Sequence, residues 1–517
     1  MIEPHFPILT CLMLLPLLGS IPFMFIKTPR ATRWWALVLS LAEMVMGLYL
    51  LRFKMGTADF QLVESVPWVP AWGLQYFLGV DGISLFMVAL TLLMFPFCVI
   101  CSWTSINSRL KEFHISLFIL VSALIGVFSA LDLVLFYMFW EAVLIPTYLL
   151  IALWGGHGRD RAALKFILYT LAGSALLLVA IIAFRVEGGS FAIPTLMSRP
   201  FSLKFQQWMF LIMALAFAVK VPLFPFHSWM PWAYGEAPVA GSIILSALMA
   251  KMGVYGFLRL GLPLTPDAAQ YFAPLLIAMS ICSILYGGLL AFAQSDLKKI
   301  IAYASLGHMG FVVLGIFLFN LNGVQGALIQ MFNHGITTGS LFAMAGILHH
   351  RSGSHDLSRS LGLGQFVPVF MGFWGFFVFA GFAFPGTNNF VGEFLILAGA
   401  FERNLWLGVF AVPGALLAAA YMLRPTQKMA WGEPSTATGW QDMIPREWVS
   451  LLPMAFLVLY LGLAPTLFLK VINPSLKHLI GALESRGAMT LLVEKHILNT
   501  SKNRVPFNGK ADGGGRP

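Results

Sequence analysis

Four charged residues lie deep inside long apolar stretches of this chain: Glu141, Lys220, Lys251 and Glu393. On insertion scales, a charged side chain at the centre of a membrane costs about 2.5–3.5 kcal/mol. Four such residues need compensating partners, and a chain that served only as a membrane anchor would have no use for them. The pattern therefore predicts a protein that moves ions.

The composition places the chain in a membrane. Of its 517 residues, 59% are hydrophobic and only 10% are charged, so a soluble fold could not cover its surface with polar groups. The net charge of +10 comes from basic residues scattered between apolar segments. This spacing indicates membrane topology and contact with lipid headgroups, and it argues against nucleic-acid binding. The first apolar stretch lacks a basic region and a cleavage site, so we expect it to be retained as a helix.

Apolar stretches of spanning length predict an all-α, polytopic membrane protein with about fourteen transmembrane helices. Prolines interrupt the seventh and twelfth of these stretches, because proline removes a backbone donor and clashes with the preceding turn. The predicted helices cover residues 7–26, 34–52, 83–103, 113–131, 132–154, 163–185, 206–234, 239–261, 272–293, 299–318, 321–348, 365–403, 405–424 and 449–470.

Two blocks of five helices suggest an internal repeat. Because each block has an odd number of helices, the second block starts from the opposite side of the membrane, as in inverted transporter repeats. We expect a surface helix at 475–497 and disorder at 500–517. The predicted organisation is helices 1–3 in 1–112, the first repeat in 113–261, the second repeat in 272–424, helix 14 at 449–470 and a C-terminal tail at 471–517.

Each repeat contains one interrupted helix beside a charge. Lys220 precedes the prolines at 222 and 225, and Glu393 follows Pro385 and Gly386. Paired broken helices in corresponding positions are typical of a transport site.

Basic residues concentrate in alternate loops. One set of loops includes Arg109, Arg159, Lys298, Arg424 and Lys428, and it outnumbers the other set, which includes Arg259. The excess predicts that the first set faces the cytoplasm.

The four charges suit a proton relay. Every immediate neighbour of Glu141 is apolar, so a lysine on a facing helix is its expected partner; a buried ion pair that only fastens two helices is the alternative. Lys220 stands at a helix break that water can reach. Lys251 is about 18 Å from either end of its helix, too far for its ammonium to reach the interface. Gly392 gives water or another helix access to Glu393.

Two histidines lie on neighbouring predicted helices. His308 and His334 could carry protons, pack against carbonyl groups or bind a haem as a pair of axial ligands. Glu43 is a further acid in an apolar helix, without a predicted partner unless a neighbouring subunit supplies one. Cys98 and Cys101 share one helix face and are expected to pack as small hydrophobic groups. The chain carries no visible metal, nucleotide or cluster motif.

Several motifs together resemble the antiporter-like subunits of respiratory complex I. They are the Phe-Trp-Glu-Ala segment around Glu141, Lys220 before Pro-Leu-Phe-Pro-Phe-His-Ser-Trp, Glu236–Ser242, Lys251 before Met-Gly-Val-Tyr-Gly, and Gly79–Ser84. The resemblance is strongest between residues 75 and 425. Glu393 on the twelfth helix resembles the M-type of these subunits, whereas the other types carry lysine there.

The resemblance implies a membrane-arm subunit of NADH-quinone oxidoreductase, a redox-driven translocase that pumps protons in the bacterial inner membrane. Glu141 would tune Lys220, Lys251 would pass protons along a hydrated axis, His308 and His334 would extend the relay, and Glu393 would serve the exit side. Neighbouring antiporter-like subunits and lipid would be its partners. No cofactor is implied in this chain; NADH, FMN, iron–sulfur clusters and quinone would belong to partner subunits.

One segment departs from the family pattern. Pro231, Trp232, Ala233 and Tyr234 stand where the family commonly has an acid and a histidine, so proton uptake beside this segment is expected to differ. Alternative functions with a similar core are a subunit of an Mrp-type cation/proton antiporter, and a membrane subunit of a membrane-bound hydrogenase or formate hydrogenlyase.

Overall fold

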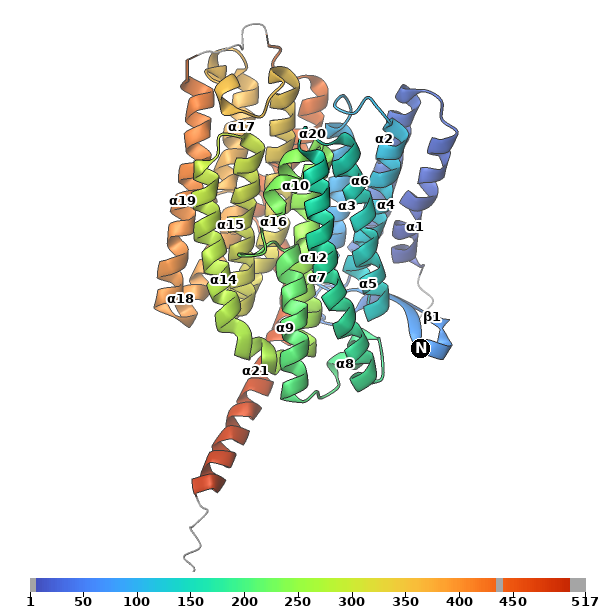
Figure 1. Cartoon of the computed structure of the whole chain (residues 1–517), viewed down its shortest axis with the longest axis vertical. Helices are drawn as coiled ribbons and strands as arrows, with labels where there is room; N and C mark the ends of the chain where they lie inside the picture. Colours follow the sequence, from blue (N-terminus) through green and yellow to red (C-terminus); the bar gives the residue numbers. More distant parts are fainter. Residues whose placement is uncertain (1–5, 434–439, 503–517) are drawn as a thin grey trace, which may run out of the picture.

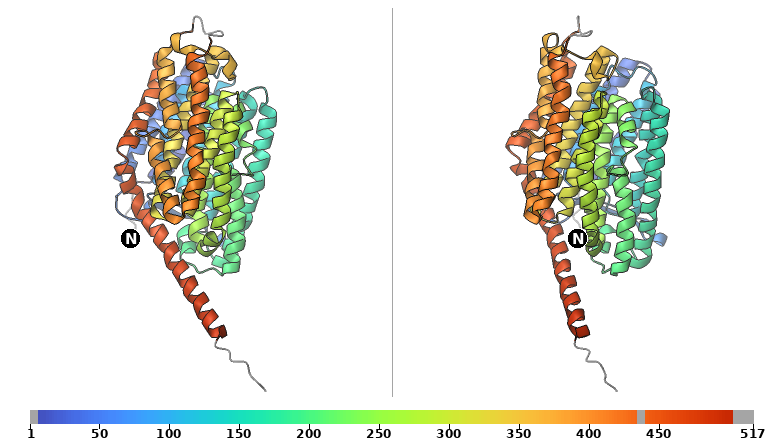
Figure 2. Two further views of the ribbon diagram at one scale, coloured as in Figure 1. Left: turned by 90° about the vertical axis from the view of Figure 1, so that its left-hand side faces the viewer. Right: turned by 60° about the vertical axis from the view of Figure 1, so that its left-hand side comes forward.

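The structure is a computed structural model that describes residues 6–433 and 440–502, with side chains in the last helix described as far as Glu484. Long helices stand side by side in one upright bundle, and the last helix projects from one end (Figures 1 and 2). The α-helices are α1 (Ile8–Ser20), α2 (Pro29–Met46), α3 (Ser84–Cys101), α4 (Leu110–Ser129), α5 (Leu133–Ala142), α6 (Leu144–Trp154), α7 (Arg159–Gly188), α8 (Ile193–Met197), α9 (Leu203–Lys220), α10 (Met230–Glu236), α11 (Val239–Ile244), α12 (Ala250–Gly256), α13 (Leu262–Leu264), α14 (Pro266–Ala293), α15 (Leu297–Phe317), α16 (Leu321–Ser352), α17 (Pro368–Gly381), α18 (Asn388–Arg403), α19 (Leu405–Trp431), α20 (Pro445–Leu463) and α21 (Thr466–Lys502).

The all-α membrane class is confirmed. Within the described residues, eleven helices are long and apolar enough to cross a membrane, and two shorter apolar helices, Ile8–Met24 and Pro368–Gly381, accompany them. Three of the fourteen predicted spans are not among the eleven: 7–26, which forms the shorter helix Ile8–Met24, and two that differ for the following reasons. The α16 helix has sufficient length but many amide, hydroxyl and imidazole side chains, and 365–403 is divided into α17 and α18. The count of about fourteen stays a prediction.

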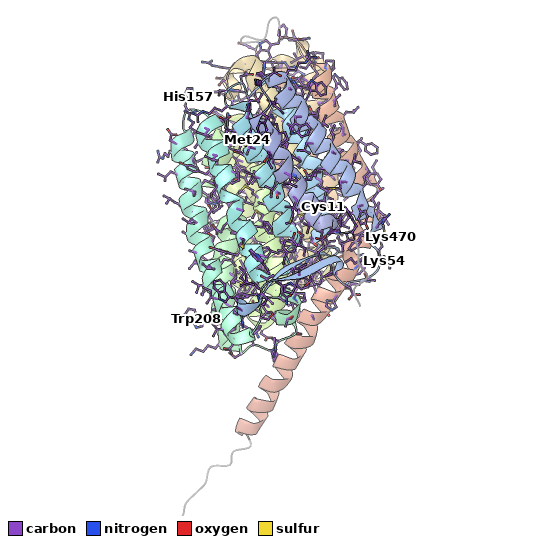
Figure 3. The ribbon with its side chains drawn as sticks, turned by 90° about the vertical axis from the view of Figure 1, so that its right-hand side faces the viewer. Cys11, Met24, Lys54, His157, Trp208 and Lys470 are labelled. Atoms are coloured by element: carbon purple, nitrogen blue, oxygen red, sulfur yellow. The ribbon has the colours of Figure 1, made fainter. Side chains whose placement is uncertain are left out.

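A hairpin that the sequence did not predict closes one end of the bundle. Strand β1 (Gln61–Val69) pairs antiparallel with β2 (Leu74–Val80), with Val66 opposite Tyr76. Gly73 turns the chain between them at φ 73°, a left-handed conformation that favours glycine. Figure 3 shows the strands near Lys54, at the end opposite His157.

The helix interruptions lie where the prolines predicted them. The helix that carries Lys220 ends at that residue, and α10 begins only at Met230. The second break separates α17 from α18 at residues 382–387. A third discontinuity, which the sequence did not predict, lies at Val143 between α5 and α6, directly after the segment that contains Glu141.

The C-terminal segment is helical earlier than expected. Predicted as a tail from residue 471 with a surface helix at 475–497, it forms α21 from Thr466, and its first half packs on the bundle. Ile472 and Leu476 are fully buried, because this part of α21 lies against α14 and α16. Of the segment expected to be disordered, residues 503–517 lie outside the described part of the chain.

A buried ion pair fastens the hairpin to the core. Asp81, just after β2, accepts a 2.5 Å hydrogen bond from Arg259 Nη2 and further bonds from the backbone N–H groups of Ile83 and Ser84. Arg259 Nε also donates to the Tyr255 hydroxyl at 3.0 Å. Both members of the pair are buried. The sequence placed Arg259 in a loop as a topology signal, which was wrong: its charge is neutralised inside the protein.

Glycines bring α16 and α18 into close contact. A Cβ atom on Gly392 would lie 2.8 Å from Gln330 Cβ, and one on Gly326 would lie 2.8 Å from the Gly392 carbonyl oxygen. Such distances are shorter than real Cβ contacts, so the two backbones meet only because neither residue has a side chain. This approach positions Glu393, the residue after Gly392, against α16.

We predict that Asp81→Asn destabilises the fold. The substitution leaves the buried Arg259 charge without a carboxylate, and breaking a buried pair in this way costs about 3–5 kcal/mol. The measurement is the thermal unfolding midpoint of the full chain in detergent. Asp59→Asn, which removes the same charge at an exposed position, is the control and should leave the midpoint unchanged. Equal midpoints for both variants would contradict the structural role of the pair.

We also predict that Gly392→Ala separates α16 from α18. One added methyl group must displace the Gln330 side chain or the helix itself, which costs about 1–3 kcal/mol in a packed core. Gly372→Ala on α17 is the matched control, because no atom lies within 4 Å of a Cβ at that position. The same unfolding assay should give a lower midpoint for Gly392→Ala alone; a similar shift in the control would refute the packing argument.

Candidate functional site

The six residues expected in the relay all lie on helices of the bundle. Five of them are buried, with 4% or less of the residue exposed, and Glu141 is half-buried. They are Glu141 on α5, Lys220 at the end of α9, Lys251 on α12, His308 on α15, His334 on α16 and Glu393 on α18.

Lys251 lies on a short α-helical segment between two π-helical turns, Leu245–Met249 and Phe257–Gly261. Such turns are rare and frequently mark functional sites, because the extra residue changes where side chains point. The Lys251 ammonium donates to the Ser246 carbonyl oxygen at 2.5 Å and lies 2.6 Å from His334 Nδ1. The lysine thus bonds directly to an imidazole on another helix.

The line of contacts continues from that imidazole to two further ionisable side chains. The His334 and His308 rings meet edge to face with centroids 5.6 Å apart, and His308 Nδ1 lies 2.7 Å from Glu393 Oε1. Gln330 Nε2 donates to the same carboxylate oxygen at 3.1 Å. Lys251, His334, His308 and Glu393 therefore form one line of ionisable groups that crosses four helices.

This geometry favours proton exchange over haem binding. An imidazole can accept a proton at one ring nitrogen and release one from the other. A haem between His308 and His334 would require both rings to face a common iron across a flat macrocycle. Their edge-to-face contact leaves no room for it, and each Nδ1 already bonds to another side chain.

Glu141 and Lys220 are near each other without forming a direct ion pair. Within the described residues, neither Lys220 Nζ nor Glu141 Oε1 has a hydrogen-bond partner. The ammonium instead lies 5.2 Å from the Trp140 ring centroid, where the face of the indole attracts a cation. The expected contact between the two charges is therefore indirect.

The two lysine-bearing segments touch close to both lysines. A Cβ on Gly253 would lie 2.8 Å from the Phe217 carbonyl oxygen and 3.0 Å from the Val221 nitrogen. Gly253 is two residues from Lys251, and Val221 directly follows Lys220. The absence of a side chain at 253 thus lets α12 lie against the break after α9.

Asn333 and Asn388 were not identified from the sequence. The Asn333 amide donates to the Asn388 carbonyl oxygen at 2.6 Å, and the Asn388 amide donates back to the Asn333 carbonyl oxygen at 3.1 Å. This reciprocal pair fixes the start of α18 to the middle of α16, next to His334. The signal available in the sequence was the pair of asparagines after Pro385 and Gly386, which marked the break but not its partner.

Two charged residues lie elsewhere than expected. Lys298, interpreted as a loop charge, is buried and donates to the carbonyl oxygens of Gly235 at 3.1 Å and Ala237 at 2.6 Å, which close the end of α10. Glu43 is fully buried on α2 and neither carboxylate oxygen has a partner within the described chain, so it does not point toward a neighbouring subunit.

Comparison with known proteins places the chain in a family. Residues 130–418 match the family model described as "NADH:quinone oxidoreductase/Mrp antiporter, TM". The chain is 38% identical over 488 residues to NADH-ubiquinone oxidoreductase chain 4 of Marchantia polymorpha, covering 93% of this chain and 98% of the relative. It is 41% identical over 467 residues to NADH-quinone oxidoreductase subunit M of Rhodobacter capsulatus, covering 87% and 91%.

A solved structure agrees with the sequence relatives. A chain of the respiratory complex I of Thermus thermophilus, solved with bound NADH, is 32% identical and superposes with a TM-score of 0.85 over 92% of this chain and 99% of that chain. The chain thus belongs to the NADH:quinone oxidoreductase/Mrp antiporter family of membrane proteins, as an antiporter-like subunit of the M (chain 4) type of NADH-quinone oxidoreductase, respiratory complex I.

Proposed function

We propose that this chain translocates protons through a buried relay of Glu141, Lys220, Lys251, His334, His308 and Glu393. The observation that carries the proposal is the 2.6 Å contact between Lys251 Nζ and His334 Nδ1. An ammonium can donate its proton to that nitrogen, and an imidazole can pass a proton onward from its other nitrogen. A side chain that only fixed two helices to each other would not need a second ring nitrogen that can release a proton.

The second half of the relay, from Lys251 to Glu393, conducts protons in three steps. Lys251 gives a proton to His334 Nδ1 and becomes a neutral amine. His334 releases a proton from Nε2, which has no hydrogen-bond partner within the described residues, toward His308. His308 shares its Nδ1 proton with Glu393 Oε1, and Glu393 Oε2, also without a described partner, is the outlet toward the opposite surface.

Internal water completes the first half of the relay, in which Glu141 and Lys220 connect with Lys251. Proteins commonly hold water where buried polar atoms have no protein partner. Lys220 Nζ, Glu141 Oε1 and His227 Nδ1 are three such atoms around the break after α9. Since Gly253 brings α12 against this break, we expect water to connect Lys220 with Lys251. The charge state of Glu141 then controls how readily Lys220 holds its proton.

Redox energy reaches the relay from outside the chain. We propose that the chain works in the membrane arm of NADH-quinone oxidoreductase, beside other antiporter-like subunits, in the bacterial inner (cytoplasmic) membrane. Partner subunits would hold NADH, FMN, the iron–sulfur clusters and quinone, and quinone reduction there would drive proton movement here. The support is the likeness to subunit M of Rhodobacter capsulatus over 87% of the chain.

Lys220→Met tests the first half of the relay. In the assembled enzyme in sealed vesicles, we expect NADH-driven proton translocation to fall about tenfold or more. A positioned proton-transfer group contributes about 10²–10⁴ in rate, and water at the same place can replace part of that contribution. The measurement is quenching of a pH-sensitive dye together with NADH oxidation. Lys204→Met, at the exposed start of the same helix, is the control. Unchanged translocation in assembled Lys220→Met would remove Lys220 from the relay.

Glu393→Gln tests the second half. The amide keeps the shape of the side chain but cannot take up the proton that His308 shares, so translocation should fall by about the same factor in the same assay. Glu402→Gln removes an exposed carboxylate from the same helix, where it accepts a bond from Asn322 at 3.1 Å, and should pump normally. If both glutamine variants pump equally well, the line from Lys251 does not continue through Glu393.

A further inference from the structure

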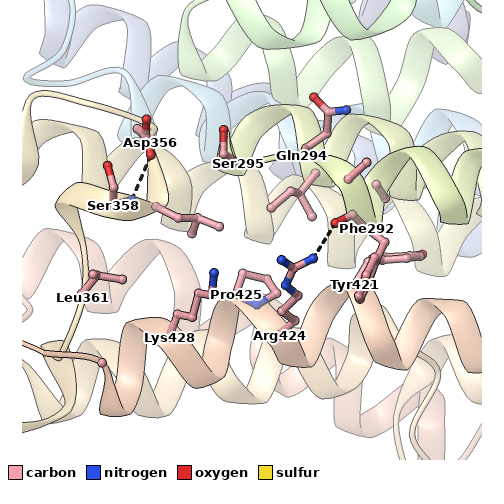
Figure 4. A pocket seen from close by; sticks show the side chains of 15 residues that line it. Phe292, Gln294, Ser295, Asp356, Ser358, Leu361, Tyr421, Arg424, Pro425 and Lys428 are labelled. Atoms are coloured by element: carbon pink, nitrogen blue, oxygen red, sulfur yellow. Dashed lines mark hydrogen bonds between the residues drawn. The ribbon is translucent and has the colours of Figure 1, made fainter.

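A cavity of about 440 Å³ lies outside the relay, at the loop end of the bundle. It is formed by the end of α14, the turn at Leu357–Arg359 and the second half of α19 (Figure 4). Helices α14 and α19 pack side by side at the edge of the bundle (Figure 1). The cavity therefore lies at the edge of the bundle.

Two cations project from α19 into this cavity. Arg424 and Lys428 are one helical turn apart, and Figure 4 shows both side chains on the cavity side of the helix. Arg424 Nη1 donates to the Phe292 carbonyl oxygen at 3.1 Å, and its guanidinium carbon lies 4.6 Å from the Phe292 ring centroid. These contacts hold the guanidinium in place while its remaining N–H groups can bind a ligand.

The cavity carries an excess of positive charge. In the part of the chain that the structure describes, no ion pair joins Arg424 or Lys428 to a carboxylate. Asp356 is the acid in the cavity wall, and the 2.9 Å bond from the Ser358 N–H holds the pKa of its carboxyl below the usual range, so it is ionised. Two cations against one carboxylate leave a net charge that an anion would neutralise.

The surroundings match the level of lipid headgroups. Below the cavity, Leu289 on α14 and Leu416 on α19 are 59% and 70% exposed, as expected for side chains that face acyl chains. Trp431, 81% exposed at the end of α19, is a residue type enriched at membrane–water interfaces. The basic-residue excess assigns this end of α19, with Arg424 and Lys428, to the cytoplasmic side, where anionic lipids are concentrated.

We propose that this cavity binds the phosphate headgroup of an anionic phospholipid of the cytoplasmic leaflet, with its acyl chains along α14 and α19. Guanidinium pairs with phosphate oxygens through two parallel hydrogen bonds, and the lysine adds a second charge. The site is independent of the relay, since it shares none of its residues.

The test is photo-crosslinking in the assembled complex, reconstituted into nanodiscs. One preparation contains photoactivatable phosphatidylglycerol and the other photoactivatable phosphatidylcholine, and mass spectrometry measures labelling of the peptide that spans residues 421–433. We expect severalfold more labelling by phosphatidylglycerol. Equal labelling by the two lipids would overturn the proposal, and this comparison needs no substitution.

A double variant localises the binding. Arg424→Gln with Lys428→Gln should lower phosphatidylglycerol labelling by roughly tenfold or more, as expected when two basic contacts are lost. The control, Lys27→Gln with Arg30→Gln, removes the same charge from exposed positions at the start of α2 and should label normally. Loss of labelling in both variants would mean that overall charge, and not this cavity, attracts the lipid.

Two further outcomes identify a different occupant. Excess inorganic phosphate that abolishes the labelling would show that the cavity takes a soluble anion, and the proposal would be wrong. Absence of any lipid label, with crosslinks from this peptide to a neighbouring subunit, would show that a protein covers the cavity and would overturn the proposal as well.

Discussion

Every charged group inside a membrane must be compensated by the protein, and this constraint shapes the whole molecule. The cost of about 2.5–3.5 kcal/mol for each charge on insertion scales is large against the net stability of a fold. In this chain the compensation comes from helix breaks, π-helical turns and facing side chains: Lys251 between two π-helical turns, Lys220 at the end of α9, and Glu393 after the break before α18. The irregular backbone and the buried charges occur together, because backbone groups freed at a break can bond to a charged side chain and so compensate both.

Close helix packing gives the site its geometry. Hydrogen bonds of 2.6–2.7 Å between side chains on different helices require the backbones to be held within fractions of an ångström. Gly392 and Gly253 supply this control by letting α18 meet α16 and α12 meet α9 at backbone contact. The glycines matter for the proposed relay although they carry no reactive group, because they determine which ionisable side chains face each other.

The sequence predicted the helices and the buried charges well, since both follow from local patterns. Hydrophobic length marks a span, and a charge within it is conspicuous, so Glu141, Lys220, Lys251 and Glu393 could be identified without a structure. What the sequence could not supply was pairing. It did not show that Lys251 bonds to His334, that Asn333 holds Asn388, or that Arg259 and Lys298 are buried inside the protein. These depend on which helix faces which. The hairpin at 61–80 was not predicted because no residue of β1 is buried, so the strand lacks the alternation of buried and exposed residues that marks a strand in a sequence.

The same physics separates fixed charges from mobile ones. Asp81 and Arg259 bond to each other, Asp81 also accepts bonds from backbone N–H groups, and Arg259 also donates to Tyr255. Because these bonds stabilise both charged forms, neither residue is suited to exchange protons. Three other polar atoms have no hydrogen-bond partner in the described chain: Lys220 Nζ, His334 Nε2 and Glu393 Oε2. An unsatisfied buried atom is costly as a structural element and useful as a proton donor or acceptor. The contrast between these two sets within one bundle supports the proposed relay, in which the groups without a partner are those that exchange protons.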